Sequence, residues 1–268
     1  MLKHFFLVSI DFSYKAVSAA LFGILLLLAF VVTAPMGHES YWGFYRYDYL
    51  LFFALVIQAL LLYFKLESWA EAKVIALFHL LAMVMELFLT HPQIASWQYP
   101  QPAVFKIYTV PLFAGFMYSA VGSFFARSLR LFNMSFVNLP SFVLMLSLAV
   151  ISYINFMSKF FIMDVRYILF AVSTVIFWRS KVMFKIRQQQ YQLPMLLILW
   201  VLALLIWIAE NISTFYQIWL YPSQVKAWHM VSWGKLGSWY LLLLLSLVLV
   251  LRVLGDMQNK TWQLKIES

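Results

Sequence analysis

Eight long apolar stretches, separated by short polar or aromatic segments, divide this chain of 268 residues. A transmembrane helix needs roughly 20 mostly apolar residues, so each stretch is a candidate membrane span. The second and sixth are near the lower limit of length for a span. The stretches are residues 16–34, 49–64, 72–90, 108–126, 141–157, 166–179, 194–214 and 232–253. We therefore expect one all-α integral membrane domain over residues 1–268, with eight transmembrane helices and no soluble catalytic domain.

The composition supports this class and excludes several kinds of site. Hydrophobic residues make up 65% of the chain and charged residues only 11%, against roughly 25% charged in a soluble domain. The absence of cysteine excludes a disulfide, a thiolate nucleophile and an iron–sulfur cluster. The five histidines form no H-E-x-x-H motif and are too scattered for a histidine-rich di-iron centre. We expect no metal site, and the composition leaves any cofactor open.

The positive charges are distributed unevenly between the two sets of connectors. The two termini and the second, fourth and sixth connectors, counted along the chain, hold 13 of the 19 lysines and arginines. The first, third, fifth and seventh connectors hold 6. The positive-inside rule then places both termini in the cytoplasm. The basic run from Arg179 to Gln190 fits anionic lipid headgroups, which attract each positive charge by about 1 kcal/mol, better than nucleic acid.

Two parts of the sequence repeat one another. "ELFLT" and "ENIST" end two of the apolar stretches, and each leads to a Trp-x-Tyr-Pro sequence and then to a glycine and a tyrosine at matched spacing. The matching pairs are Glu86 and Glu210, Thr90 and Thr214, Trp97 and Trp219, Tyr99 and Tyr221, Pro100 and Pro222, Gly115 and Gly237, and Tyr118 and Tyr240. We interpret the helices at 72–90 and 108–126, and those at 194–214 and 232–253, as two copies of one hairpin. Ligand sites often lie where such repeats meet.

Glu86 and Glu210 are the acidic residues that lie within apolar stretches. A charged side chain at the centre of a membrane costs about 2.5–3.5 kcal/mol on insertion scales, so such residues are candidates for function. The alternative is structural, because a buried protonated glutamate that ties two helices together contributes about 0.6–2 kcal/mol. His79 lies seven residues before Glu86, on the same helix face, and is either a proton relay or a core residue.

Other charged residues have simpler explanations. Ser68 and Glu71 have the spacing of a capping box at the start of a helix. Lys235 is either a counter-ion of the glutamates or extends to the membrane interface. For the remaining charged residues of the outer connectors we expect pairing with one another, and these residues are Arg46, Asp48, Asp164 and Arg166.

The order of these motifs resembles a bacterial family. The sequences "KLESWAEAKVIALFHLLAMVMELF", "SWQYPQPAVFKIYTVPLFAGFMYSAVGS", "AENISTF", "WLYPSQ" and "WGKLGSWYLL" look like the YoaT-like family of integral membrane proteins. This resemblance implies a bacterial inner-membrane protein and supplies no activity. "TAPMGHESYWGFYRYD" and the Thr–Trp-x-Tyr hairpins are also similar in layout to membrane carotenoid cyclases and hydratases. The paired glutamates that such cyclases carry in the following helix are missing here.

The leading functional hypothesis is an enzyme that acts on a lipid or isoprenoid chain by acid–base chemistry. Glu86 and Glu210 would divide the acid and base roles, and His79, Tyr118 and Tyr240 would shuttle protons or orient the substrate. Further substrate-binding candidates are Lys235, Trp97, Tyr99, Trp219, Tyr221 and Asn211. The alternatives are a small proton-coupled transporter, which needs a polar lining that continues past His79, and a non-catalytic lipid-binding or assembly factor. We expect membrane lipids or a hydrophobic small molecule as partners, and no nucleic acid.

Overall fold

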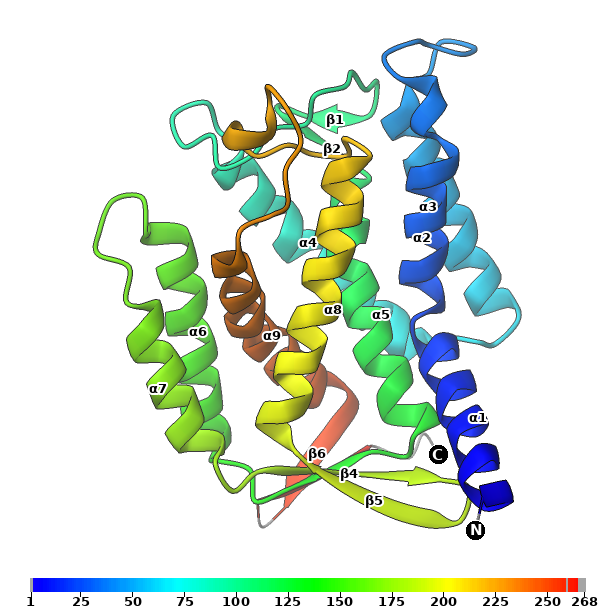
Figure 1. The fold of residues 1–268 in the computed structure, drawn as a ribbon, viewed down its shortest axis with the longest axis vertical. Coiled ribbons are helices and arrows are strands. Elements are labelled where there is room, and N and C mark those ends of the chain that lie inside the picture. The colour runs from blue at the N-terminus through cyan, green and yellow to red at the C-terminus, as the bar shows by residue number, and fades with distance from the viewer. Residues whose placement is uncertain (1, 259, 265–268) are drawn as a thin grey trace. The chain divides into compact units, whose positions relative to one another are not determined.

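A computed structural model describes residues 2–258 and 260–264, and in this part of the chain it contains nine α-helices (Figure 1). They are α1 (Leu2–Ala19), α2 (Leu21–Val32), α3 (Arg46–Tyr63), α4 (Trp69–Leu89), α5 (Ala114–Leu131), α6 (Phe142–Ser158), α7 (Arg166–Phe177), α8 (Met195–Phe215) and α9 (Trp233–Leu254). Each predicted apolar stretch overlaps one of the helices α2 to α9. Helix α1 was not expected as a separate element, because its apolar residues are mixed with polar ones.

Fewer of these helices are able to cross a membrane than the sequence suggests. Within the described residues, α3, α4, α8 and α9 are long and apolar enough. The segments Phe6–Ala19 and Leu21–Met36 pass the same test together, as a pair bent by 66°, so the number of candidate spans is four or at most five. Helix α7 has 12 residues, which cover about 18 Å of a hydrocarbon core about 30 Å thick. The eight predicted helices therefore exist, but eight spans are not confirmed.

The prediction of an all-α fold is wrong at one end of several helices, where the chain forms an antiparallel sheet. Its five strands are ordered β5-β4-β3-β7-β6. Their bounds are β3 (Ser135–Val137), β4 (Lys181–Ile186), β5 (Gln189–Pro194), β6 (Gly255–Gln258) and β7 (Thr261–Leu264), and a separate pair is formed by β1 (Lys106–Ile107) and β2 (Val110–Pro111). In β4 the side chains of Val182, Phe184 and Ile186 are buried, and they alternate with exposed Lys181 and Lys185 and half-buried Met183. This period of two predicts a strand, but the density of basic residues concealed it.

Contacts divide the chain into two compact units. One contains the chain up to Leu21, Gly122–Leu205 and the chain from Leu236, and the other contains Phe22–Val121 and Ile206–Lys235. The five-stranded sheet belongs to the first unit, in which Trp262 packs against Phe136 and donates its indole N–H to the carbonyl oxygen of Leu251. This division does not test whether residues 1–268 form a single membrane domain, which stays a prediction.

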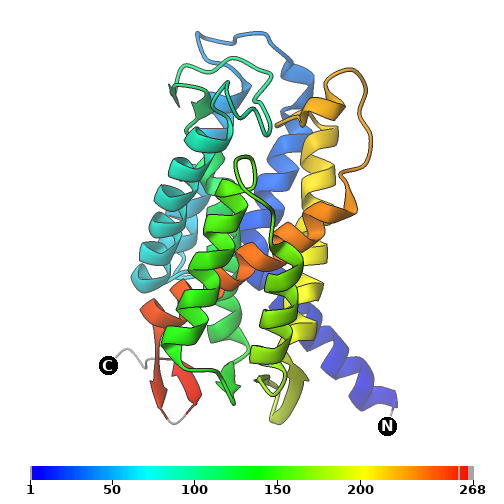
Figure 2. The ribbon, with the colours of Figure 1, turned by 90° about the vertical axis from the view of Figure 1, so that its left-hand side faces the viewer.

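The turn between α6 and α7, two helices that run side by side in Figure 2, confirms one predicted ion pair. Arg166 and Asp164 approach to 2.5 Å, and the amide of Asn155 donates to Asp164 at 3.0 Å. The Asn155 side-chain oxygen in turn accepts the backbone N–H of Val165. Burial alone would raise the pKa of Asp164, but the hydrogen bonds from Arg166 and Asn155 outweigh it and lower this pKa to about 2.

The expectation that the charged residues of the outer connectors pair with one another is wrong for Arg46 and Asp48, because other described residues satisfy each of them separately. Asp48 is buried and accepts backbone N–H groups from Tyr45, Val104 and Phe105 at 2.8–3.0 Å. It therefore closes a capping box at the start of α3 and fixes the loop before β1. The sequence could not predict the contacts with Val104 and Phe105, since these backbone groups are more than fifty residues away.

Arg46 is also buried, and oxygen atoms of neutral groups surround its guanidinium. It donates to the carbonyl oxygens of Phe30 and Tyr216 at 2.7 and 2.9 Å and to the hydroxyl of Thr33 at 3.1 Å. A longer hydrogen bond of 3.4 Å reaches the side-chain oxygen of Gln101. Arg46 thus ties the end of α2, the end of α8 and the loop after Pro100 together.

Candidate functional site

Glu86 lies in the last turn of α4 and belongs to the second unit. It is 1% exposed. Its Oε2 accepts the indole N–H of Trp97 at 2.8 Å and the hydroxyl of Tyr99 at 2.9 Å, and its Oε1 accepts the hydroxyl of Tyr118 at 2.8 Å. A carboxylate offers about four lone-pair directions, so the described residues fill three of them and leave one, on Oε1, open. Three neutral donors therefore fix the orientation of this carboxylate.

Glu210, on α8, has a related environment. Its side chain is 3% exposed, and its Oε1 accepts the hydroxyl of Tyr221. Trp219, two residues before Tyr221, lowers the pKa of the Tyr221 hydroxyl, so the two side chains interact. Tyr99 and Tyr221 are the tyrosines of the two Trp-x-Tyr-Pro sequences, and each donates to the glutamate at the end of the helix before it.

A short backbone bridge joins the two Trp-x-Tyr-Pro loops. Gln98 and Leu220 are the second residues of the two Trp-x-Tyr-Pro sequences. They form two reciprocal hydrogen bonds of 2.9 Å, each from the backbone N–H of one residue to the carbonyl oxygen of the other. Beside this bridge the ring of Tyr221 meets the ring of Trp97 edge to face, with 6.2 Å between centroids. The bridge brings the environments of Glu86 and Glu210 together within one unit.

Lys235, at the start of α9, contacts the same rings. Its ammonium nitrogen lies 4.0 Å from the ring centroid of Tyr221 and 5.6 Å from that of Trp97, within the range of cation–π attraction. Its side chain is partly exposed. We call this group of residues the glutamate cluster. It consists of Glu86, Glu210, Trp97, Tyr99, Tyr118, Trp219, Tyr221 and Lys235.

The two loop tyrosines of the glutamate cluster are held in their neutral form. Burial raises the pKa of Tyr99 well above its ordinary value, and the adjacent charge of Glu86 raises it further. Burial also raises the pKa of Tyr221, with a further contribution from Glu210. Both hydroxyls therefore remain protonated at neutral pH and continue to donate to the carboxylates.

A cavity of about 390 Å³ lies beside the cluster, at the loop end of α4. Trp97 and Tyr99 form part of its wall, so the residues that bind Glu86 also face the cavity. The hydroxyls of Thr90 and Thr109 lie 2.7 Å apart in the same wall, which also includes Lys106. This volume is in the usual range for small-molecule sites. Thr109 and Lys106 were not among the predicted site residues, because nothing in the loop pattern shows which residues face a common space.

His79 lies on α4, seven residues before Glu86, and makes no hydrogen bond to the described residues of the cluster. Its ring lies 4.6 Å from the ring of Phe116 and occupies the space where a side chain at Gly115 would be. The Nδ1 atom is buried and has no hydrogen-bond partner among the described residues. The predicted relay from Glu86 to His79 stays a prediction, and the structure shows no hydrogen bond that carries it.

Tyr240 does not occupy the position that its match with Tyr118 suggests. It belongs to the first unit, where its hydroxyl lies 3.0 Å from the hydroxyl of Ser173 and its ring stacks on Trp200 at 4.3 Å. Tyr118 instead contacts Glu86. The two matched tyrosines therefore have different partners, because α5 and α9 pack against different helices at this level.

Asn211, next to Glu210, has a structural role. Its side-chain nitrogen donates to the carbonyl oxygen of Trp207 at 2.8 Å, and its side-chain oxygen accepts the backbone N–H of Val231 at 2.8 Å. These bonds anchor the long loop between α8 and α9 to the last turns of α8. Both ends of the amide are therefore occupied, and we do not place Asn211 in the glutamate cluster.

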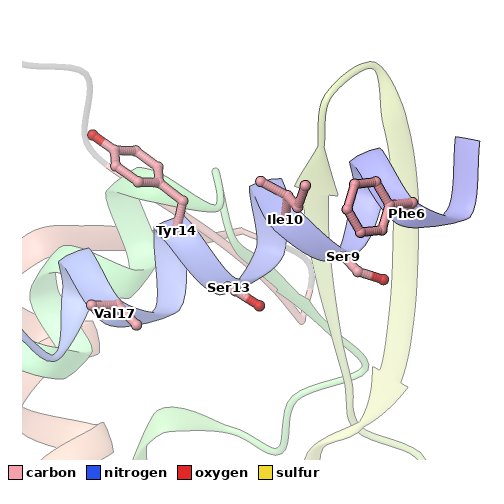
Figure 3. Close-up of a pocket in the computed structure, with 6 residues that line it drawn as sticks. All are labelled: Phe6, Ser9, Ile10, Ser13, Tyr14 and Val17. Atoms are coloured by element: carbon pink, nitrogen blue, oxygen red, sulfur yellow. The ribbon is translucent and has the colours of Figure 1, made fainter. Parts of the chain in front are cut away.

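A second hollow runs along α1 and lacks the features of a site (Figure 3). All of its lining residues come from this one helix, and they are Phe6, Ser9, Ile10, Ser13, Tyr14 and Val17. Their spacing of three and four residues defines one helix face. Among the described residues there is also no group of three or more histidine, cysteine, aspartate or glutamate side chains that could hold a metal ion.

Comparisons with known proteins identify the family. A family model described as "Protein of unknown function (DUF817)" matches residues 9–247, which include the whole glutamate cluster. The chain is also 38% identical over 205 residues to "Uncharacterized protein YoaT" of Bacillus subtilis (strain 168), a match that covers 76% of this chain and 77% of that protein. No solved structure matches the chain. The resemblance to YoaT is thus confirmed, and the chain belongs to the DUF817 family.

Proposed function

We propose that this protein is a multi-pass protein of the bacterial inner membrane that transfers protons on a lipid or isoprenoid substrate at the glutamate cluster. Four apolar helices, or five with the bent pair, support the membrane location. The similarity to a Bacillus subtilis protein supports a bacterial source. The excess of basic residues at the termini and even-numbered connectors supports cytoplasmic termini.

The environment of Glu86 carries the proposal. An indole N–H can only donate, and the two tyrosines complete a set of three donors around the carboxylate. One lone-pair direction on Oε1 is left for a proton from a substrate. Glu86 is therefore built as a general base of fixed orientation. Glu210, with Tyr221 as its donor, is the second carboxylate and returns the proton.

The cavity supports an enzyme rather than a transporter. It lies at the loop end of α4 and shares Trp97 and Tyr99 with the glutamate cluster, so the reacting end of a substrate fits there while its chain lies along the apolar helices. A transporter needs polar groups that continue from Glu86 past His79. The Nδ1 atom of His79, which has no hydrogen-bond partner in the described part of the chain, and the packing of this ring against Phe116 argue against such a continuation.

We also propose that α4–α5 and α8–α9 are two copies of one hairpin, with the site where they meet. Reciprocal hydrogen bonds between Gln98 and Leu220, at matching positions, support this interpretation. So does the tyrosine-to-glutamate bond that both copies form. The two copies differ at Tyr240, which contacts Ser173, whereas the matching Tyr118 contacts Glu86.

Lipid analysis of cells that produce the protein tests this function. We expect one lipid or isoprenoid species to change when wild-type protein is produced, and not to change with Glu86→Gln or Glu210→Gln. Glutamine at position 86 keeps the hydrogen bonds, because its oxygen accepts from Trp97 and Tyr99 while its NH₂ donates to the Tyr118 hydroxyl. The measurement is mass spectrometry of extracted membrane lipids at matched protein levels.

Glu71→Gln is the matched control, since Glu71 is a buried glutamate of the same helix with a capping role. It should leave the lipid change intact. Glu86→Leu reports on folding instead, because three donors lose their acceptor at about 1–3 kcal/mol each if they stay buried. Lipid profiles that are the same for wild type and for both glutamine variants would refute the proposed function.

A further inference from the structure

The glutamate cluster is arranged around a positive charge. The ammonium group of Lys235 lies over the ring faces of Tyr221 and Trp97, at 4.0 and 5.6 Å from the centroids. The negative face of an aromatic ring attracts cations, and aromatic rings grouped around one point recognise substituted ammonium ions. Lys235 therefore shows which ligand chemistry these rings suit.

The side chains of Trp97 and Tyr221 also donate hydrogen bonds to the carboxylates, and this strengthens the attraction of their rings for a cation. The N–H of Trp97 donates to Glu86 and the hydroxyl of Tyr221 donates to Glu210. Donation to an anion moves electron density into the ring, as expected when linked hydrogen bonds polarise one another. A cation on the ring faces is thus attracted both by the rings and by the negative charges behind them.

Glu86 itself lacks a cationic partner among the described residues. Its hydrogen bonds come from Trp97, Tyr99 and Tyr118, all of them neutral, and it forms no ion pair in the described part of the chain. A buried charge that is not paired is costly, and a bound cation offsets this cost. The open lone-pair direction on Oε1 is where an ammonium N–H would donate.

Lys235 is suited to give way to such a ligand. Its side chain is partly exposed and its ammonium group is carried on four flexible methylene groups, so it can withdraw toward solvent. Lys106, in the wall of the neighbouring cavity, is exposed and its charge is screened by water. The buried carboxylates therefore dominate the local field.

We infer that the glutamate cluster binds the ammonium group of an amine-bearing substrate, in competition with the side chain of Lys235. This rests on the proposed proton transfer and names its substrate class. A primary ammonium gives one proton to the Glu86 carboxylate, so that R–NH₃⁺ and the carboxylate become R–NH₂ and the carboxylic acid, with charge conserved. A quaternary ammonium has no proton to give and binds without reacting.

Choline and its neutral isostere 3,3-dimethylbutan-1-ol test the inference, because they have the same shape and differ in charge. Each is titrated calorimetrically into the purified full-length protein in a neutral detergent, at constant ionic strength. We expect choline to bind at least tenfold more tightly than the alcohol, and Glu86→Gln to weaken choline binding at least tenfold. Equal affinity for choline and the alcohol would overturn the inference.

A pair of lysine variants distinguishes competition between choline and the Lys235 ammonium group from a general effect of removing one positive charge. Lys235→Met should strengthen choline binding severalfold because it removes the resident ammonium. Lys226→Met, an exposed lysine outside both the cluster and the cavity wall, should leave choline binding unchanged. These variants decide the matter even if Glu86→Gln fails to fold. Weaker choline binding in Lys235→Met, or the same gain in both variants, would contradict the competition.

The two proposals can fail separately. Choline binding that needs Glu86, without any lipid change that needs Glu86, would keep the ammonium site and reject the lipid chemistry. A Glu86-dependent lipid change, with equal affinity for choline and the alcohol, would keep the chemistry and reject the ammonium substrate.

Discussion

Single residues of the two hairpins, inside and outside the glutamate cluster, owe their behaviour to a few close neighbours. Glu86 has one partner that can only donate, Trp97, and this leaves its carboxylate as the acceptor. His79 depends on the absence of a side chain at Gly115, since a Cβ there would lie 2.6 Å from its Cε1 atom. The matched glycine, Gly237, leaves room for Phe170 in the same way, with a Cβ 2.6 Å from its ring. Both glycines of the repeat thus serve close packing rather than backbone flexibility.

Gly115→Ala should lower the free energy of unfolding by about 1–3 kcal/mol, the usual cost of overpacking a core. Gly23→Ala is the control, because its Cβ would meet the Cβ of Ala120 at an ordinary 3.6 Å, and alanine favours a helix by up to about 1 kcal/mol. Denaturant unfolding in detergent measures both. The double variant Gly115→Ala/His79→Ala should recover part of the loss, and equal destabilisation by Gly115→Ala and Gly23→Ala would contradict this account.

At the scale of elements, helix ends and turns depend on local polar contacts, and some of these are readable from sequence. The capping box of Ser68 and Glu71 is confirmed, with hydrogen bonds of 2.7 and 3.2 Å at the start of α4. The Asp164–Arg166 pair is also confirmed. Both are predictable because their partners lie within three residues. The β4–β5 hairpin was missed although its alternation is local, because the basic residues suggested a lipid-facing segment instead.

The turn between α6 and α7 should lose stability in acid because of Asp164. Its folded pKa of about 2 is below its ordinary value of 3.8, so the carboxylate stabilises the folded state above about pH 4. This contribution is lost as the pH falls from about 4 to 2. Melting temperatures of wild type and Asp164→Asn should therefore differ at neutral pH and converge near pH 2. A difference that does not depend on pH would show that Asp164 acts through shape alone.

For the whole molecule, the distribution of lysines and arginines predicts which connectors face the cytoplasm. The chain has no cysteine, so single cysteines can be introduced at exposed lysines without background. A membrane-impermeant maleimide should label Lys106→Cys and Lys226→Cys in intact cells, and Lys185→Cys only after permeabilisation. Mass shifts on gels measure the labelling. The reverse pattern would invert the proposed topology, and labelling of all three in intact cells would reject it.

Sequence alone determined the positions of helices α2 to α9, the family resemblance, the short-range capping contacts and the two glutamates as candidates. These depend on apolar runs and on neighbours in the chain, which a single sequence contains. The tertiary structure decided the rest, since the partners involved are distant in sequence. It showed Tyr118 with Glu86 and Tyr240 with Ser173. It joined the loops through Gln98 and Leu220, and it placed the ammonium of Lys235 on the rings that bind both glutamates. Matched residues in a repeat acquire different partners because packing depends on neighbouring helices, which the repeat itself does not specify.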